Sequence, residues 1–142
     1  MINRENWLTI KKYLSYLSTV RQLDHKTIYL YKSCFTHLLK WADATPLESA
    51  REIDKTFPAY LVHARQSTNR SEGELNPVTM ANYCSYVQGF YHWAKQEFPR
   101  KYRKITPSWI ETIIPDRAHG KQSITTNQDY YTLEDMLRIA SL

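Results

Sequence analysis

The chain carries the same helix-like pattern twice, and this repeat restricts its fold more than any other feature. Residues 27–42 read TIYLYKSCFTHLLKWA, and residues 79–94 read TMANYCSYVQGFYHWA. Apolar side chains recur at three- and four-residue steps in both segments, which is the spacing of an α-helix with one apolar face. The repeat therefore predicts two long helices that present similar sides to one core. The aromatic residues expected at equivalent core positions are Tyr31 and Tyr83, and Trp41 and Trp93.

Helical spacing continues through most of the chain, whereas the strict alternation of a β-strand is hard to find. With the repeated pair, the expected helices cover residues 6–18, 24–43, 54–65, 76–98 and 107–113. The apolar side of the first helix should consist of Trp7, Ile10, Leu14 and Leu17. Asp24 and Asn76 have the short polar side chains typical of helix N-caps, and Pro77 suits a first helical position. The chain is therefore expected to be all-α.

A polar segment follows the last of these helices and separates the predicted bundle from another short helical pattern. Residues 116–131 are expected to be an exposed linker. After them, Thr132 and Asp135 resemble a capping box at the start of a new amphipathic helix, within which the given sequence ends. We therefore expect one domain over residues 1–115, then the linker, and then the first helix of a truncated second domain over residues 132–142.

The positive charge of the chain is distributed unevenly. The sequence has 19 Lys and Arg against 14 Asp and Glu, a net charge of +5. Residues 1–40 contain seven basic and two acidic side chains, residues 95–104 contain five and one, and residues 76–94 contain none. Basic clusters on either side of an uncharged helix favour a polyanionic partner such as nucleic acid.

Several other classes of function lack a signal in the sequence. No apolar run reaches the length of a membrane span and no signal peptide is evident, so a cytoplasmic protein is expected. Cys34 and Cys84 are too few for a disulfide framework and should be reduced, semi-buried thiols within helices. No histidine pair has metal-ligand spacing, and no glycine-rich phosphate loop or Ser/His/Asp signature occurs. We therefore expect no metal, no cofactor, no small-molecule substrate and no membrane partner.

Five motifs follow one another along the chain at characteristic spacings. They are YLSYL, KTIYLYKSCFTHLLKWA, IDKTFPAYLVHAR, NPVTMANYCSYVQGFYHWA and YTLEDMLRIA. Their order resembles the N-terminal half of a tyrosine recombinase, of the phage integrase family, over about residues 6–142. The resemblance implies the family's core-binding domain, also called the SAM-like N-terminal domain. That domain is an orthogonal bundle of four to five helices, in which two helix pairs cross steeply and lie on one side of the DNA.

The resemblance also implies what the fragment does. Members of the family cut and rejoin DNA during integration or recombination through a covalent phosphotyrosyl intermediate, without a cofactor, and they assemble with other recombinase protomers. Their catalytic residues lie in the C-terminal domain, of which TLEDMLRIASL matches only the start. The fragment is therefore expected to bind double-stranded DNA as part of a site-specific recombinase but to lack the catalytic residues. None of its eleven tyrosines is expected to be the nucleophile.

In the family, the second and fourth helices present their N-terminal parts to the major groove of DNA, which implies a set of contacting side chains. On the second helix they are Lys26, Thr27 and Lys32. On the fourth helix they are Thr79, Asn82 and Tyr86. Asparagine can pair with adenine through two hydrogen bonds, while threonine and tyrosine commonly reach phosphates. The alternative is that the threonines pack or cap the helix ends and that Asn82 is a solvated surface amide.

Further basic residues are expected to contact the phosphate backbone. The dense run after the fourth helix, for which a solvated basic surface is the alternative, consists of Arg100, Lys101, Arg103 and Lys104. The polar loop before that helix is flanked by Arg65 and Arg70. The expected linker, which in the family runs along the DNA, contains Arg117 and Lys121.

Two other interpretations remain open from the sequence. A stand-alone all-α DNA-binding regulator would use the same helices without an attached enzyme. A helical protein–protein interaction module would use the aromatic side chains as an interface, and its charge would be incidental. An arginine, a His-x-x-Arg motif and a tyrosine in a continuation beyond residue 142 would distinguish the recombinase from both.

Overall fold

The computed structural model describes residues 2–67 and 75–115 of the chain. These residues form five α-helices and one short 3₁₀-helix, and they contain no strand. The elements are α1 (Arg4–Thr19), α2 (His25–Ala42), η1 (Leu47–Glu52), α3 (Phe57–Ser67), α4 (Pro77–Glu97) and α5 (Pro107–Glu111). The predicted all-α fold is confirmed. The expected linker over residues 116–131 and the expected last helix over residues 132–142 lie outside the described residues.

Local side-chain hydrogen bonds determine where the two long helices begin. The Asp24 carboxylate accepts a hydrogen bond of 2.8 Å from the backbone N–H of Thr27, and the Asn76 side chain accepts one of 2.8 Å from that of Thr79. Each bond satisfies a backbone donor that has no partner within the helix. The N-caps predicted for α2 and α4 are therefore confirmed, and Pro77 occupies the first turn of α4 as predicted.

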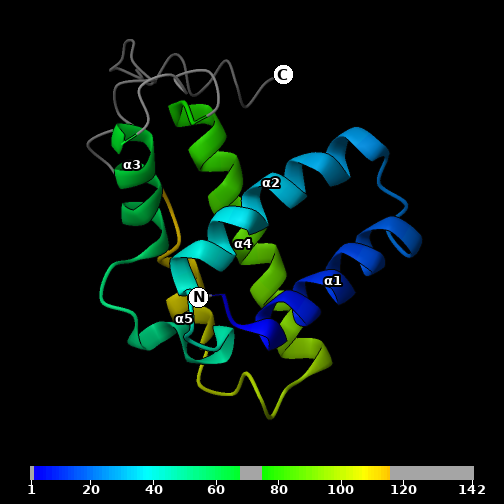
Figure 1. The fold of residues 1–142 in the computed structure, drawn as a ribbon. Coiled ribbons are helices and arrows are strands. Elements are labelled where there is room, and N and C mark those ends of the chain that lie inside the picture. The colour runs from blue at the N-terminus through cyan, green and yellow to red at the C-terminus, as the bar shows by residue number, and fades with distance from the viewer. Residues whose placement is uncertain (1, 68–74, 116–142) are drawn as a thin grey trace, which may run out of the picture.

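The helices are arranged as two antiparallel pairs that cross. Figure 1 shows α1 beside α2, and α3 beside the upper half of α4, with α2 passing across α4 near the middle of the bundle. The contacts between α2 and α4 join the two repeated segments, and α5 packs on α4. This is the orthogonal arrangement that the family resemblance implies, and it exposes the first turns of α2 and α4 at the upper side of Figure 1.

Aromatic side chains fill the crossing between α1, α2 and α4. Tyr13 of α1 lies 5.7 Å from Phe35 of α2 and 5.5 Å from Phe90 of α4, measured between ring centroids. The paired tryptophans are both buried, as predicted, and the indole N–H of Trp41 donates a hydrogen bond of 2.6 Å to the backbone carbonyl of Lys55. Such edge-on aromatic packing contributes beyond the area that it buries.

The side of α1 that faces the core agrees with its apolar spacing except at Trp7. Ile10 and Leu17 are buried and Leu14 packs against the core, as predicted. Trp7 is 45% exposed, and Tyr13 and the polar Asn6 and Thr9 are buried in addition. The Asn6 amide nitrogen donates to the carbonyl of Thr45 (2.9 Å), and its oxygen accepts from the N–H of Leu47 (2.9 Å). The prediction for Trp7 is wrong because the hydrogen bonds of Asn6 hold this side of α1 against the chain that enters η1.

The segment between α2 and α3 also differs from the prediction. Leu47–Glu52 forms the short 3₁₀-helix η1, where only a break was expected, and it buries Leu47 and Ala50. Helix α3 begins at Phe57 rather than near residue 54, and the side-chain oxygen of Thr56 accepts from the N–H of Ala59 (3.3 Å). Thr56 thus acts as a side-chain cap at the start of α3.

Candidate nucleic-acid interface

A shallow groove lies between α2 and the N-terminal half of α4. Its volume is about 400 Å³. It is lined by Tyr29, Leu30, Ser33, Thr36, His37, Leu75, Thr79 and Tyr83. The lining contains no Lys, Arg, Asp or Glu, and it is rich in hydroxyl and aromatic groups. A surface of this kind can approach a polar partner closely without burying a charge.

The three residues predicted on α4 share one side of the helix, because they are three, four and seven positions apart. Thr79 and Tyr86 are half-buried, and Asn82 is exposed. Thr79 lies in the first turn and lines the groove, while its backbone N–H is bonded to the Asn76 cap. Its side chain therefore does not serve as the cap. Asn82 projects from the same side, where its amide is available to a partner.

Thr27 behaves differently from Thr79. Hydrogen bonds from the backbone N–H and the side chain of Thr27 lower the pKa of the Asp24 carboxyl. The Thr27 hydroxyl is thus close to the Asp24 cap at the start of α2, whereas Thr79 is half-buried and lines the groove. Contact of either threonine with a partner stays a prediction.

A tyrosine pair closes one side of the surface between α2 and α4. The rings of Tyr31 and Tyr86 stack with centroids 4.0 Å apart and an interplanar angle of 19°. Tyr31 is only half-buried, so the core position predicted for it is not reached, whereas its counterpart Tyr83 is buried as predicted. Burial raises the pKa of both Tyr31 and Tyr86, so both are neutral phenols near pH 7 and can donate hydrogen bonds.

Basic residues stand around this groove. Lys26 and Lys32 are exposed on the first turns of α2, and each lies one helical turn from Tyr29, which lines the groove. Arg65 is in the last turn of α3. Because α3 runs antiparallel to α4, Arg65 lies at the same end of the bundle as the start of α4 (Figure 1). The structure thus places Lys26 and Lys32 at the margin of the groove, and Arg65 at the same end of the bundle.

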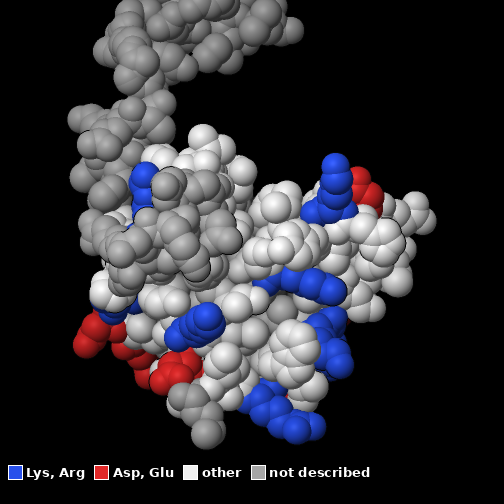
Figure 2. Space-filling view, turned by 45° about the horizontal axis from the view of Figure 1, so that its top comes forward, with Lys and Arg blue, Asp and Glu red and all other residues white. Residues whose placement is uncertain are grey.

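The dense basic run lies at the other end of α4. Its four residues, Arg100, Lys101, Arg103 and Lys104, are all exposed. Helix α4 has 21 residues, which corresponds to a length of about 30 Å, so the run and the groove form separate surfaces. On the face shown in Figure 2, Lys and Arg side chains are spread over uncharged surface, and most acidic ones gather at the lower left. The predicted site residues therefore do not form one patch.

The fold adds one basic residue to this second surface that was not predicted from the sequence. Lys12 of α1 lies with its Nζ 5.4 Å from the ring centroid of Phe98, and Lys101 lies 6.0 Å from the same centroid. The pair Lys11–Lys12 on α1 is the only sequence signal, and it does not reveal which segment packs beside that helix. Three other predicted contact residues, Arg70, Arg117 and Lys121, lie outside the described residues.

Other kinds of site find no support in the part of the chain that the structure describes. No group of three His, Cys, Asp or Glu side chains in that part is placed to hold a metal ion. Cys34 and Cys84 are free thiols and buried. Burial raises the pKa of Cys34 and raises that of Cys84 to about 12, so neither thiol is reactive near pH 7. Within residues 2–67 and 75–115, no helix is long and apolar enough to cross a membrane.

The comparison with protein families agrees with the orthogonal helical bundle. The family described as "Phage integrase, N-terminal SAM-like domain" matches residues 10–98 of the 142. These residues extend from α1 to the end of α4 and include both helices of the groove. The chain therefore belongs to this family, and it is related to the tyrosine recombinases. Searches of the curated proteins and of the solved structures find no match.

Proposed function

We propose that this bundle binds double-stranded DNA as the core-binding domain of a site-specific tyrosine recombinase. The observation that carries the proposal is the groove between α2 and α4. Hydroxyl groups line it, the exposed amide of Asn82 lies beside it, and cations stand at its margins while none lines its floor. Membership of the integrase family supports the same function and makes a stand-alone regulator or a protein-binding module the weaker interpretation.

Side chains in and around the groove contribute to DNA recognition in three ways. Lys26 and Lys32 at the margin of the groove, with Arg65 at the same end of the bundle, neutralise phosphates and supply affinity that does not depend on sequence. The hydroxyl groups of Thr79 and Tyr86 donate to phosphate oxygens and set the position of the bundle on the duplex. The amide of Asn82 reaches a base edge in the major groove and contributes sequence preference.

The cutting and rejoining of DNA belongs, in this proposal, to the catalytic domain of the recombinase. Residues 1–115 bind and position the duplex, residues 116–131 connect the two domains, and residues 132–142 begin the catalytic one. The bundle takes no part in bond breaking, which proceeds through a phosphotyrosyl intermediate without a cofactor. Other recombinase protomers on the same DNA are the expected protein partners, and the protein acts in the cytoplasm.

The proposal is tested by titrating a labelled duplex of about 20 base pairs with the 142-residue chain and following fluorescence anisotropy. At low salt we expect non-specific binding with a Kd of about 10⁻⁴ to 10⁻⁶ M, which weakens between about 50 and about 200 mM salt. Lys26→Ala with Lys32→Ala should lower the slope of log affinity against log salt by about 1.8, because each lost phosphate contact removes about 0.9.

The matched control is Lys40→Ala with Lys55→Ala, which removes two exposed lysines outside the proposed contacts. This control should keep the slope of the parent chain. Absence of binding at low salt, or affinity that does not change with salt, would reject DNA binding. Equal slopes for the two double variants would show that the groove is not the contact surface.

A further inference from the structure

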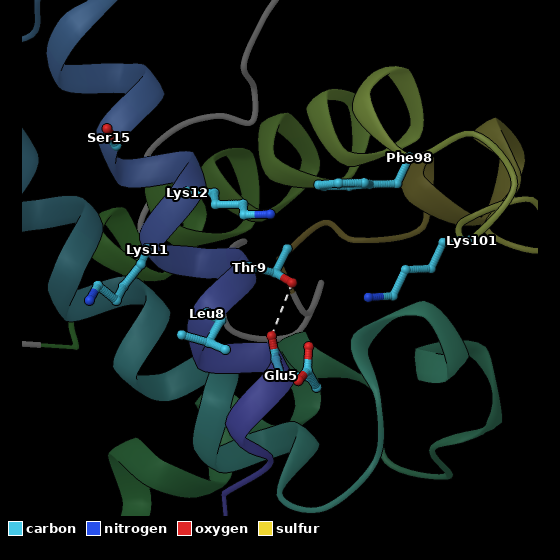
Figure 3. Close-up of a pocket in the computed structure, with 8 residues that line it drawn as sticks. All are labelled: Glu5, Leu8, Thr9, Lys11, Lys12, Ser15, Phe98 and Lys101. Carbon is cyan, nitrogen blue, oxygen red and sulfur yellow. Dashed lines mark hydrogen bonds between the residues drawn. The ribbon is translucent and has the colours of Figure 1, made fainter.

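A second hollow lies between α1 and the segment that follows α4. Its volume is about 420 Å³. It is lined by Glu5, Leu8, Thr9, Lys11, Lys12, Ser15, Phe98 and Lys101. Figure 3 shows the side chains of Lys12 and Lys101 extending toward one another from opposite walls, beside the ring of Phe98, while Lys11 points away. We call this hollow the Phe98 cleft.

Two positive charges converge on this cleft, and neither is held in an ion pair with the Glu5 carboxylate that also lines it. The Nζ atoms of Lys12 and Lys101 lie 5.4 and 6.0 Å from the centroid of the Phe98 ring. Among the described residues, neither ammonium group forms an ion pair. Each cation is attracted to the ring, but the two like charges repel one another. A bound anion would remove that repulsion, so the arrangement favours an anionic ligand.

The aromatic ring between the lysines is held from behind. Phe98 packs edge-on against Trp93 at 5.9 Å between centroids, and it lies 6.4 Å from Tyr102, which is buried. The ring that attracts both ammonium groups is therefore half-buried and packed against the core. Ordering two lysine side chains normally costs conformational entropy, and a fixed ring reduces the cost that remains when a ligand binds.

We propose that the Phe98 cleft is a second phosphate site, which holds a phosphodiester group of nucleic acid between Lys12 and Lys101. The inference rests on the proposed function that the bundle binds DNA, and it adds a contact that the groove does not supply. Lysine ammonium groups attract phosphate as point charges and carry no base specificity. The exposed Arg100 beside the cleft extends the same positive surface along a backbone.

The position of the cleft determines how a duplex could reach it. The groove contacts the first turns of α4 and the cleft adjoins its end, so about 30 Å of helix separates them. One turn of duplex DNA is about 34 Å long. A single duplex that follows α4 could therefore place phosphates at both sites, and a second duplex at the cleft is the other source of the same chemical group.

The test compares Lys12→Ala with Lys101→Ala against the control Lys40→Ala with Lys55→Ala, again by anisotropy across a range of salt. All four lysines are exposed, so the substitutions should leave the fold intact. The cleft variant should lower the salt slope by about 1.8, and the control should not. Phe98→Leu, which keeps an apolar side chain but removes the aromatic face, should weaken binding about two- to fivefold.

A variant that removes a negative charge from the cleft tests whether the ligand is an anion. Glu5 is the one acidic residue in the lining of the cleft, and Figure 3 shows its side chain on the same side as the two lysines. Glu5→Gln should therefore strengthen binding about two- to threefold, because it removes the repulsion between the Glu5 carboxylate and the bound phosphate, which is weak as both charges are near the surface. Unchanged or weaker binding by this variant would count against a phosphate in the cleft.

Duplex length separates the two sources of phosphate. If one duplex spans both sites, the cleft variant should lose affinity for a duplex of about 24 base pairs and not for a hairpin with a stem of about 6 base pairs, which at about 20 Å is shorter than the separation of the two sites. Equal losses at both lengths, with two duplexes bound per chain, indicate a second duplex; either result supports the proposal. If the cleft variant keeps the salt slope of the parent chain while the parent binds DNA, the second site is refuted and the proposed function is not. The same holds if the cleft variant has lost binding to poly-glutamate, a polyanion that is not a nucleic acid. Absence of DNA binding by the parent overturns both proposals.

Discussion

The buried side chain of Asn6 provides the sharpest test of how the bundle is held together. Asn6 is only 2% exposed, and it bridges the first turn of α1 to the backbone before and within η1. Replacement by alanine leaves the N–H of Leu47, a fully buried residue, without a partner. An unsatisfied buried donor costs about 1–3 kcal/mol, and the lost bond to the half-buried Thr45 costs about 0.5–1.5 kcal/mol more.

Alanine is a better helix former than asparagine by about 0.6 kcal/mol, which offsets part of this loss. We therefore expect Asn6→Ala to lower the free energy of unfolding by about 2 kcal/mol and the melting temperature by roughly 10 °C. Urea unfolding followed by tryptophan fluorescence measures the first quantity, and circular dichroism during heating measures the second. Ser18→Ala, at an exposed position of the same helix, is the control and should change stability little.

A loss for Asn6→Ala of no more than about 0.5 kcal/mol, the usual range for surface substitutions, would refute the reasoning. It would mean that water or a rearranged backbone satisfies the N–H of Leu47. The substitution lies far from the groove, so the variant should also bind DNA like the parent chain under conditions where both are folded. A selective loss of affinity in the folded variant would show that Asn6 does more than connect α1 to η1.

Two further predictions concern single side chains at the start of the long helices. Asn82→Ala should change the relative affinities for different duplex sequences by about 1–3 kcal/mol at one position with the salt slope unchanged, and a uniform loss over all sequences would exclude a base contact. Hydrogen bonds from Thr27 lower the pKa of Asp24 in the folded chain. The contribution of this cap to the stability of the fold should therefore be complete above the unfolded pKa of about 3.9 and should disappear as the pH falls through the lower folded pKa. Asp24→Asn keeps a capping side chain without this titration, so its melting temperature should fall less than that of the parent between about pH 5 and about pH 2; parallel curves would contradict the assignment.

What the sequence by itself determined was the set of long helices and the family. Helical period and N-caps depend on residues within one or two turns of one another, and such local signals survive in any tertiary context. The repeat therefore predicted α2 and α4, and Asp24 and Asn76 marked where they begin. The short η1 and the later start of α3 were missed because their boundaries depend on weaker local preferences and on contacts with α1.

Only the tertiary structure decided which side chains meet. Apolar spacing placed Trp7 in the core, but the neighbouring Asn6 takes the buried position through its hydrogen bonds to Thr45 and Leu47, and the tryptophan is exposed. Charge counts along the chain grouped the basic residues by sequence, whereas the crossing of the helices separates the basic run from the groove by the length of α4 and joins Lys12 to Lys101 across Phe98. The physical reason is that period gives each helix an apolar side but not its rotation, its crossing angle or its neighbour, which are set by packing between residues far apart in the chain.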